Sequence, residues 1–236
     1  MKRLPVIAMD GPGGAGKSTV ARLVATRCGY TYIDTGAMYR AIALKLLRDS
    51  ALADSHGEAL AALAGDAVRD SAIEFRPGGR VFLDGEDVTG ALRGPEVERL
   101  VPRVAAVPEV REALVAAQRR LGAAGGVVMD GRDVGTCVFP DAEYKFFVTA
   151  TQEERVDRRY RELARRGAHV TRQAVARELA ERDRQDRERD VAPLSPAPDA
   201  ILLDTTGLTV EDVVARVLAV VGASAHGAVP SPAPVG

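Results

Sequence analysis

The chain has 236 residues and a mass of 25.0 kDa, enough to bury a core without disulfides or structural metals. Its 32 basic and 33 acidic residues leave a net charge of −1, so no overall basic field favours nucleic acid or an anionic membrane as partner. The two cysteines, Cys28 and Cys137, form no C-x-x-C pair, which argues against structural zinc. The N-terminal apolar run is short, and no apolar stretch reaches about 18 residues, so we expect a soluble cytoplasmic protein.

Alternating strand and helix patterns begin at the N-terminus. Residues 6–9 form an apolar run typical of a buried parallel strand, and the apolar positions that follow Ser18 recur at helical spacing until Gly29. Residues 30–33 predict a second strand, and a helix follows Thr35 and Gly36. Three further apolar runs, at 127–129, 146–148 and 201–203, complete five candidate strands. The pattern predicts an α/β fold with a doubly wound parallel sheet.

One region interrupts this alternation. Residues 72–75 and 80–83 flank Pro77-Gly78-Gly79, and another strand-like piece lies at Val88, which predicts an antiparallel hairpin. We therefore expect an inserted subdomain at 56–108, within a core made of residues 1–55 and 109–222.

The C-terminal third is strongly charged. Residues 151–190 contain 12 arginines and 10 acids, a composition typical of solvated helices with i,i+4 ion pairs. A helix is expected over 171–190 and an amphipathic one over 209–221. Residues 223–236, rich in Ala, Pro and Gly, predict a disordered tail.

Residues 11–18, Gly-Pro-Gly-Gly-Ala-Gly-Lys-Ser, match G-x-x-x-x-G-K-[ST] between a predicted strand and a predicted helix. Glycines let backbone N–H groups surround an anion, the helix N-terminus adds a positive dipole, and Lys17 can reach the β- and γ-phosphates. Ser18 is then placed to ligate Mg²⁺. The sequence thus predicts an ATP-binding loop at Gly11, Gly13, Gly14, Ala15, Gly16, Lys17, Ser18 and Thr19.

Two observations reduce the number of P-loop protein classes to which the chain could belong. The chain contains no asparagine, so the N-K-x-D guanine-recognition motif of GTPases is missing. The strand at 127–130 ends in Asp130 and runs into Gly131-Arg132-Asp133, without the glutamate expected of a motor or AAA-type ATPase. Arg132, and Arg40 after another strand, favour a second anion at the carboxyl edge of the sheet. A small-molecule kinase fits this pattern best.

The predicted helix at 171–190 carries a stripe that begins with Val175 and Leu179 and ends with Arg182, Asp186 and Arg189. Charges on an inward stripe are costly unless they are paired or bind a ligand. We interpret the charged end as part of a phosphate-binding cleft, with a structural ion-pair network as the alternative.

These blocks, together with residues 34–40, 130–136, 139–142 and 181–194, closely resemble the bacterial cytidylate kinases, relatives of the adenylate kinases, over about residues 6–221. The resemblance implies a P-loop NTPase three-layer fold with a helical lid at about 151–170, and an inserted NMP-binding subdomain. It implies transfer of the ATP γ-phosphate to CMP or dCMP, with Mg²⁺ as cofactor, by a monomer in pyrimidine metabolism.

The resemblance also assigns site residues. CMP would contact Thr35, Tyr39, Arg40, Arg111, Arg132, Asp133, Arg182, Asp186 and Arg189. Lys17, Arg132 and the lid residues Arg155, Arg158 and Arg159 would act in catalysis, and Ser18 and Asp130 would hold the metal. Pro102 occupies the place of a serine that the family commonly uses to recognise the base, which leaves the exclusion of UMP open.

Two alternatives remain from the residues alone. The first is another P-loop kinase, for adenylate, uridylate or shikimate. The second is a nucleotide-dependent RNA-binding protein that uses the arginine-rich helix. The near-balance of acids in that helix and the 4% aromatic content disfavour the second.

Overall fold

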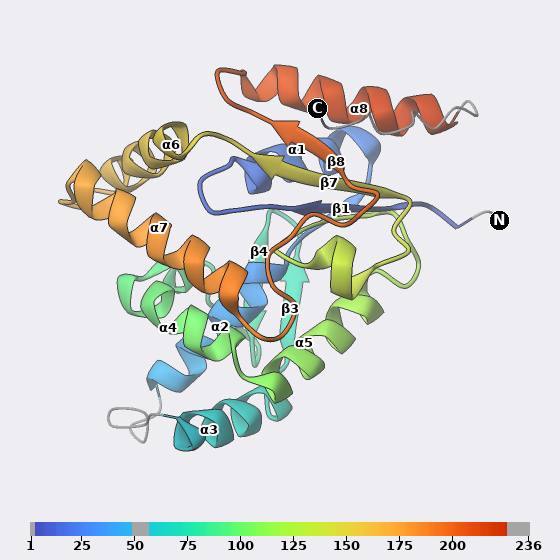
Figure 1. Ribbon diagram of the computed structural model, residues 1–236. Helices are drawn as coiled ribbons and strands as arrows, with labels where there is room; N and C mark the ends of the chain where they lie inside the picture. Colours follow the sequence, from blue (N-terminus) through green and yellow to red (C-terminus); the bar gives the residue numbers. More distant parts are fainter. Residues whose placement is uncertain (1–2, 49–56, 226–236) are drawn as a thin grey trace. The chain divides into compact units, whose positions relative to one another are not determined.

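A five-stranded sheet, in the order β2-β6-β1-β7-β8, organises the computed structural model, which describes residues 3–48 and 57–225 (Figure 1). The pairs β1·β6, β1·β7 and β7·β8 are parallel. The predicted parallel sheet is therefore confirmed. Its strands are β1 (Val6–Asp10), β2 (Thr31–Asp34), β6 (Val127–Asp130), β7 (Tyr144–Thr149) and β8 (Ile201–Asp204).

The chain divides into two compact units. The first comprises Met1–Tyr32, Ala124–Glu188 and Ala192–Gly236, and the second comprises Ile33–Ala123 with Arg189–Val191. The range 57–108 of the expected insertion lies within the second unit, and residue 56 falls outside the described residues. The boundaries proposed from the sequence stay a prediction.

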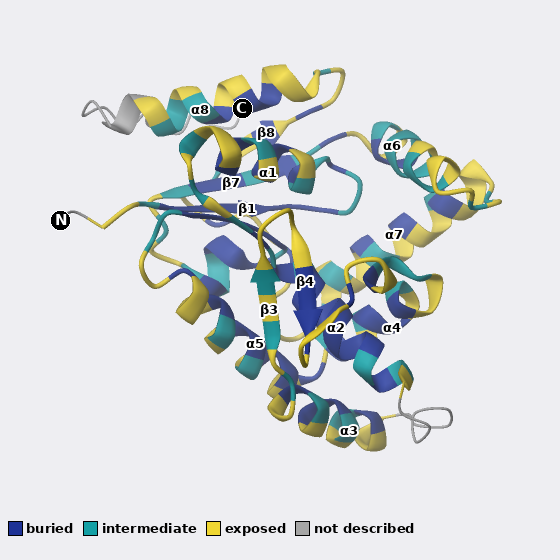
Figure 2. Cartoon of the chain, turned by 180° about the vertical axis from the view of Figure 1, so that it is seen from behind, coloured by how far each residue is buried: buried dark blue, intermediate teal, exposed yellow. Residues whose placement is uncertain are grey.

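The core of the first unit lies between the sheet and two helices, α1 (Lys17–Cys28) and α8 (Val210–Ala225). β1 is buried along its whole length, as Figure 2 shows, because it pairs on both sides and both of its faces are covered. Gly29 ends α1 in the left-handed conformation, with φ 69°, as expected of a glycine C-cap. α8 includes residues 223–225, and the rest of the expected tail, 226–236, lies outside the described residues.

The second unit has its own core, formed by four helices and a small antiparallel sheet. Gly78 and Gly79, both with positive φ, make the turn of the predicted hairpin. Val88 lies just after the third strand instead of within it, although its N–H donates to the Val81 carbonyl at 3.0 Å. The elements are α2 (Thr35–Arg48), α3 (Glu58–Arg69), β3 (Ile73–Arg76), β4 (Arg80–Leu83), β5 (Glu86–Asp87), a 3₁₀ turn η2 (Ala91–Arg93), α4 (Pro95–Ala105) and α5 (Pro108–Leu121).

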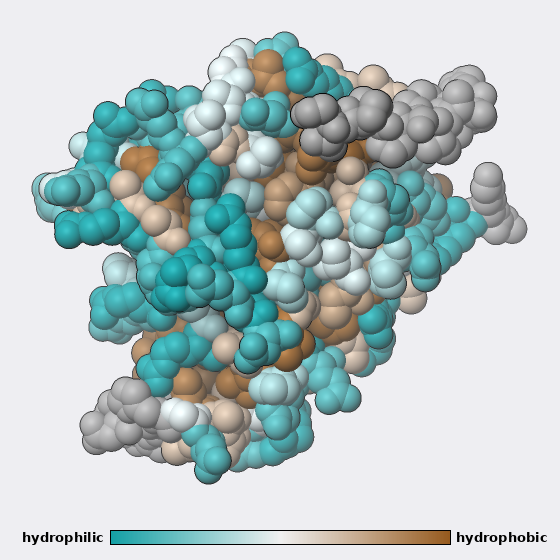
Figure 3. All heavy atoms as spheres, in the orientation of Figure 1, coloured by the Kyte–Doolittle hydropathy of each residue, from teal (hydrophilic) through white to brown (hydrophobic). Residues whose placement is uncertain are grey.

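Two helices of the first unit, α6 (Gln152–Arg165) and α7 (Arg172–Glu188), correspond to the charged segment of the sequence. They pack through Val156, Val175 and Leu179, and their outer surfaces are hydrophilic (Figure 3). The Thr151 hydroxyl accepts the N–H of Glu154 at the start of α6, and the Thr171 hydroxyl accepts that of Ala174 in α7. The expected helix at 171–190 is present and ends at Glu188. No helix in the described part of the chain combines the length and the apolar composition that a membrane span requires.

The sheet core yields a stability prediction. Phe146 on β7 is 2% exposed, and its removal leaves a cavity, so Phe146→Ala should lower the free energy of unfolding by about 3–5 kcal/mol. Leu202 on the neighbouring β8 is 57% exposed, so Leu202→Ala should change it by less than about 0.5 kcal/mol. Urea denaturation of both variants tests the packing, and equal losses would contradict it.

Candidate active site

The loop at residues 11–16 connects β1 to α1 and depends on glycine at two close approaches. A Cβ at Gly11, with φ 139°, would lie 2.0 Å from the Val148 carbonyl oxygen of β7. One at Gly14, with φ 75°, would lie 2.8 Å from the Arg155 carbonyl oxygen of α6. The motif is therefore held between a strand and a helix of the same unit, and larger side chains do not fit.

Lys17 is buried within this loop, and its Nζ donates to the Pro12 carbonyl at 2.7 Å. Burial and the positive charge of Arg132 lower the pKa of Lys17 to about 7, although Asp130 and Asp10 oppose the shift. The Lys17 ammonium is thus held at the loop, and additional negative charge nearby would stabilise its protonated form.

Ser18 and Asp130 converge, as the metal prediction requires. Ser18 Oγ donates to Asp130 Oδ2 at 2.5 Å, and Tyr32 Oη donates to Asp130 Oδ1 at 3.0 Å. Hydroxyl and carboxylate oxygens are ligands that suit Mg²⁺. The residues present therefore fit the ion, and Tyr32, which the sequence did not single out, orients the carboxylate.

Asp10, the last residue of β1, connects this loop to the turn after β6. Its two carboxylate oxygens accept the N–H groups of Val134 and Gly135 at 2.8 and 2.7 Å. These residues begin η3 (Val134–Val138), a π-helical turn. Burial raises the pKa of Asp10 to about 6, even though both backbone donors act to lower it. The turn that carries Arg132 and Asp133 is thereby fixed to the strand that leads into the P-loop.

Two acids of α7, the buried Asp183 and the half-buried Asp186, hold arginines beside the P-loop. Arg132 Nε donates to Asp186 Oδ2 at 2.7 Å, and the charge of Asp186 raises the pKa of Arg132 against the effect of burial. Arg155 Nη1 lies 2.6 Å from Asp183 Oδ2 and donates to the Gly13 carbonyl at 3.0 Å. Arg132 and Asp186 were expected at the site, whereas Asp183 was not.

The two other predicted lid arginines differ in their contacts. Arg158 Nη1 donates to the Ala15 carbonyl at 3.2 Å and to Thr205 Oγ1 at 2.8 Å, so it also lies at the P-loop. Arg159 pairs with Glu162 of its own helix at 3.1 Å. The structure thus brings Arg155 and Arg158 to the loop, and the contact found for Arg159 is local.

The second unit contains a separate group of predicted residues. Arg40 is buried, and its Nη2 donates to Asp34 Oδ2 at 2.7 Å, while Asp34 Oδ1 accepts the N–H of Ala37. The Arg111 guanidinium lies over the Tyr39 ring, 5.8 Å from its centroid. Thr35, Arg40 and Arg111 are buried at 4%, 7% and 3% exposure, which is unusual for polar side chains. Asp34, directly before the predicted helix, was missed as the partner of Arg40.

The predicted site residues therefore fall into two groups. The P-loop residues, Asp130, Arg132, Asp133, Arg155, Arg158, Arg182 and Asp186 belong to the first unit. The second unit holds Thr35, Tyr39, Arg40 and Arg111, together with Arg189, which follows α7. Pro102 lies within α4.

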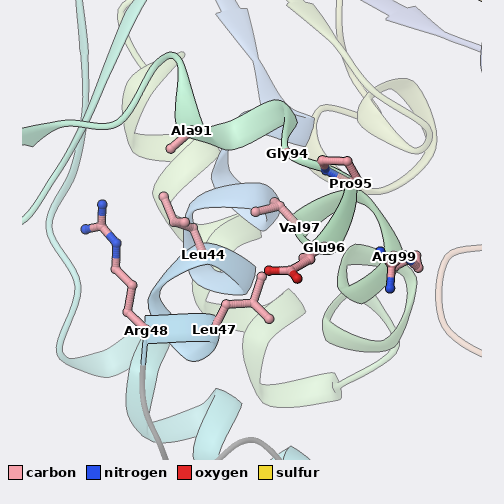
Figure 4. A pocket seen from close by; sticks show the side chains of 9 residues that line it. All are labelled: Leu44, Leu47, Arg48, Ala91, Gly94, Pro95, Glu96, Val97 and Arg99. Atoms are coloured by element: carbon pink, nitrogen blue, oxygen red, sulfur yellow. The ribbon is translucent and has the colours of Figure 1, made fainter. Parts of the chain in front are cut away.

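A pocket of about 480 Å³ lies elsewhere in the second unit (Figure 4). Leu44, Leu47 and Val97 form its apolar part, and the Arg48 guanidinium is tied to Glu86 by two hydrogen bonds of 2.7 and 2.8 Å. None of its lining residues is a predicted site residue.

Comparison with known proteins identifies the family. The family model described as cytidylate kinase matches residues 7–223. The chain belongs to the cytidylate kinase family. A cytidylate kinase of Desulfitobacterium hafniense (strain Y51) is 52% identical over 218 residues, covering 92% of this chain and 93% of that one. One from Geobacillus thermodenitrificans (strain NG80-2) is 51% identical, covering 94% and 98% of the two chains.

Among solved structures, an uncharacterised protein from Eubacterium ventriosum ATCC 27560 is similar, with a TM-score of 0.52 and 12% identity over 94% of this chain and 99% of that one. At this identity the likeness concerns the fold alone. It agrees with the layered α/β architecture described above.

The buried carboxylate of Asp10 predicts that part of the free energy of unfolding is lost as the pH rises. Its pKa of about 6 exceeds the ordinary 3.8, so between these values the folded chain binds a proton that the unfolded chain has released. The contribution of Asp10 to stability therefore falls as pH rises. The free energy of unfolding of the wild type, minus that of Asp10→Asn, should fall by about 2 kcal/mol from about pH 4 to about pH 7.

Asp199 provides the matched control. Its hydrogen bond from Lys145 lowers its pKa below the ordinary 3.8, so the corresponding difference for Asp199→Asn should rise only up to about pH 4 and stay nearly level from there to about pH 7. Urea denaturation across this pH range measures both differences. A flat or rising curve for Asp10→Asn would show that the carboxylate is not held as described.

Proposed function

We propose that this chain transfers the γ-phosphate of ATP to CMP or dCMP, giving ADP and CDP or dCDP, with Mg²⁺ bound to the donor nucleotide. The observation that carries the proposal is the P-loop, whose Lys17 is buried and whose Ser18 donates to Asp130, in a chain of the cytidylate kinase family. The family makes CMP the first candidate acceptor, ahead of adenylate, uridylate and shikimate.

The donor nucleotide is proposed to bind at residues 11–19. The backbone N–H groups of the loop and the N-terminus of α1 favour phosphate oxygens. Ser18 and Asp130 would hold Mg²⁺, which when bound neutralises phosphate charge as a Lewis acid. Arg155 and Arg158, each donating to a P-loop carbonyl, lie close enough to the loop to contact the transferred group.

The acceptor is proposed to be bound by arginines that paired acids hold in place. Arg40, Arg132 and Arg189 would bind the CMP phosphate, and Arg182 and Asp186 would contact the sugar. Arg111 and Asp133 would read cytosine, beside Thr35 and Tyr39. Because Pro102 has no side-chain hydrogen-bond donor, discrimination against UMP would depend on Arg111 and Asp133.

The chemistry needs little covalent help from the protein. In phosphoryl transfer, alignment of the acceptor oxygen and neutralisation of spread negative charge supply most of the acceleration. Fixed cations in a largely dehydrated site act more strongly than the same charges in water. The buried Lys17 and Arg155 meet this requirement. We further propose that residues 56–108 form the monophosphate-binding subdomain, that 151–170 act as the lid, and that the enzyme is a cytoplasmic monomer.

A substrate panel tests the acceptor. ADP release with ATP and Mg²⁺ should be stimulated strongly by CMP and dCMP, more weakly by UMP, and not by AMP or shikimate. A coupled assay at matched concentrations measures this. Stimulation by AMP, UMP or shikimate above that by CMP would replace the proposed acceptor, and salt-sensitive RNA binding without CMP-stimulated release would favour the RNA-binding alternative.

Lys17 tests the donor site. Lys17→Ala should lower kcat by about 10²–10³-fold, since it removes a fixed charge at the phosphates, and should leave the chain folded. Lys45, which pairs with Asp84 at 2.8 Å in the second unit, serves as the control, and Lys45→Ala should retain normal turnover. Steady-state kinetics and circular dichroism provide the measurements. Near-normal turnover by Lys17→Ala would remove Lys17 from the mechanism.

A further inference from the structure

We propose that Asp183 is a positioning residue, which acts through Arg155 by holding its guanidinium at the P-loop in the place that phosphoryl transfer requires. The inference rests on the proposed function, and it assigns a role to an acid of α7 that the sequence pattern did not select. Asp183 is 4% exposed, among the most buried acids in the described part of the chain.

A single nitrogen of the Arg155 guanidinium, Nη1, contacts both Asp183 and the P-loop. Nη1 lies 2.6 Å from Asp183 Oδ2 and donates to the Gly13 carbonyl oxygen at 3.0 Å. The carboxylate therefore fixes the guanidinium at a P-loop residue. Arg155 also contributes its backbone to the site, because its carbonyl lies against Gly14.

The pair does not have the geometry of an ion pair optimised for stability alone. Stable arginine–carboxylate pairs are commonly bidentate, as in Arg48 with Glu86, whose two hydrogen bonds are 2.7 and 2.8 Å. In contrast, Arg155 Nε and Asp183 Oδ1 are both buried and have no hydrogen-bond partner among the described residues. An unsatisfied buried polar atom costs about 1–3 kcal/mol, so a purely structural pair is a poor explanation.

The monodentate arrangement leaves donor capacity on Arg155 beside the P-loop. A guanidinium has five N–H donors, and Asp183 engages only one of its nitrogens. The remaining N–H groups can donate to phosphate oxygens while the carboxylate still holds the guanidinium. Asp183 also reduces the cost of keeping Arg155 charged in a site where each side chain is less than one-tenth exposed, at 8% and 6%.

Packing determines where Asp183 lies. It continues the row of Val175 and Leu179 at four-residue spacing, and these three are the buried residues of α7. Leu179 Cδ2 lies 3.2 Å from where a Cβ on Gly13 would stand, so this row packs directly against the P-loop. The carboxylate is thus carried by a rigid helix that touches the same residue whose carbonyl Arg155 binds.

A double-mutant cycle tests the proposal with wild type, Asp183→Ala, Arg155→Ala and the double variant. Asp183→Ala should lower kcat about 10–100-fold, because a displaced catalytic group loses alignment, with the KM for CMP changing much less. In the Arg155→Ala background the same change should have little further effect on kcat. Asp183→Asn, which keeps the shape without the charge, should fall between wild type and Asp183→Ala and guards against misfolding of the alanine variant.

The matched control is Glu181→Gln, which disrupts an exposed arginine pair of α7, with Arg184 at 2.7 Å, and should leave kcat unchanged. The charge of Asp183 also acts on Arg132. If Asp183 worked through Arg132, its loss would remain fully additive with Arg155→Ala. Additivity, or a kcat of Asp183→Ala and Asp183→Asn within twofold of wild type, would overturn the proposal.

ATP affinity gives a second readout that separates the two proposals. Calorimetry should show ATP binding weakened about threefold or more by Asp183→Ala, and only while Arg155 is present. If wild type binds ATP without CMP-stimulated ADP release, the proposed acceptor is wrong, and the cycle in ATP affinity still decides the role of Asp183. If Asp183→Ala then bound ATP as tightly as the wild type, the proposed role of Asp183 would be overturned.

Discussion

The carboxylate of Asp10, which accepts two backbone N–H groups from the turn after β6, is the constraint on which the site depends. It joins the strand that leads into the P-loop to the residues that follow Arg132 and Asp133. Without it, the donor loop and the turn would be related through strand pairing and the hydrogen bond between Ser18 and Asp130. Its burial carries a cost, visible in a pKa raised to about 6, and the two N–H donors offset part of that cost. An amide of the same shape has an NH2 group in place of one of these two oxygens, so one of the two backbone N–H groups would face a donor.

The same principle recurs around the phosphate-binding groups, since acids fix the polar and cationic side chains before any anion is bound. Asp186 orients Arg132, Asp183 holds Arg155, and Asp34 positions Arg40 in the second unit. Asp130 is oriented in turn by Ser18 and Tyr32. Unpaired arginines would repel one another and would be costly to bury. Preformed pairs lower this cost and fix the arginine rotamers. Binding of phosphate then costs less conformational entropy.

Sequence reasoning reached the elements whose residues carry a strong local signal. The apolar run of β1, the glycine loop and the cap at Gly29 are dictated by backbone geometry, so a single sequence suffices to find them.

The prediction of which residues of α7 face inward was only partly correct. Spacing by three and four selected Arg182 and Asp186, whereas the structure buries Asp183 in the row of Val175 and Leu179. On a helix, neighbours at i+3 and i+4 lie on the same side, and only the packing partner decides which edge faces inward. Tyr32 was missed for a similar reason, because strand periodicity does not reveal which carboxylate a hydroxyl will reach.

Burial also bears on the presence of a lysine, rather than an arginine, at position 17 of this arginine-rich chain. The chain has 32 basic residues, only four of them lysines. A guanidinium keeps its charge when buried, as the raised pKa of Arg132 illustrates, and it therefore suits positions that must be cationic at all times. An ammonium loses its proton more readily, and burial lowers the pKa of Lys17 to about 7. The phosphate anions that Lys17 is proposed to bind favour its charged form, so binding of the nucleotide and protonation of Lys17 reinforce each other. The compact ammonium of Lys17 donates to the Pro12 carbonyl within the loop, and the charges of Asp130 and Asp10 oppose the loss of its proton.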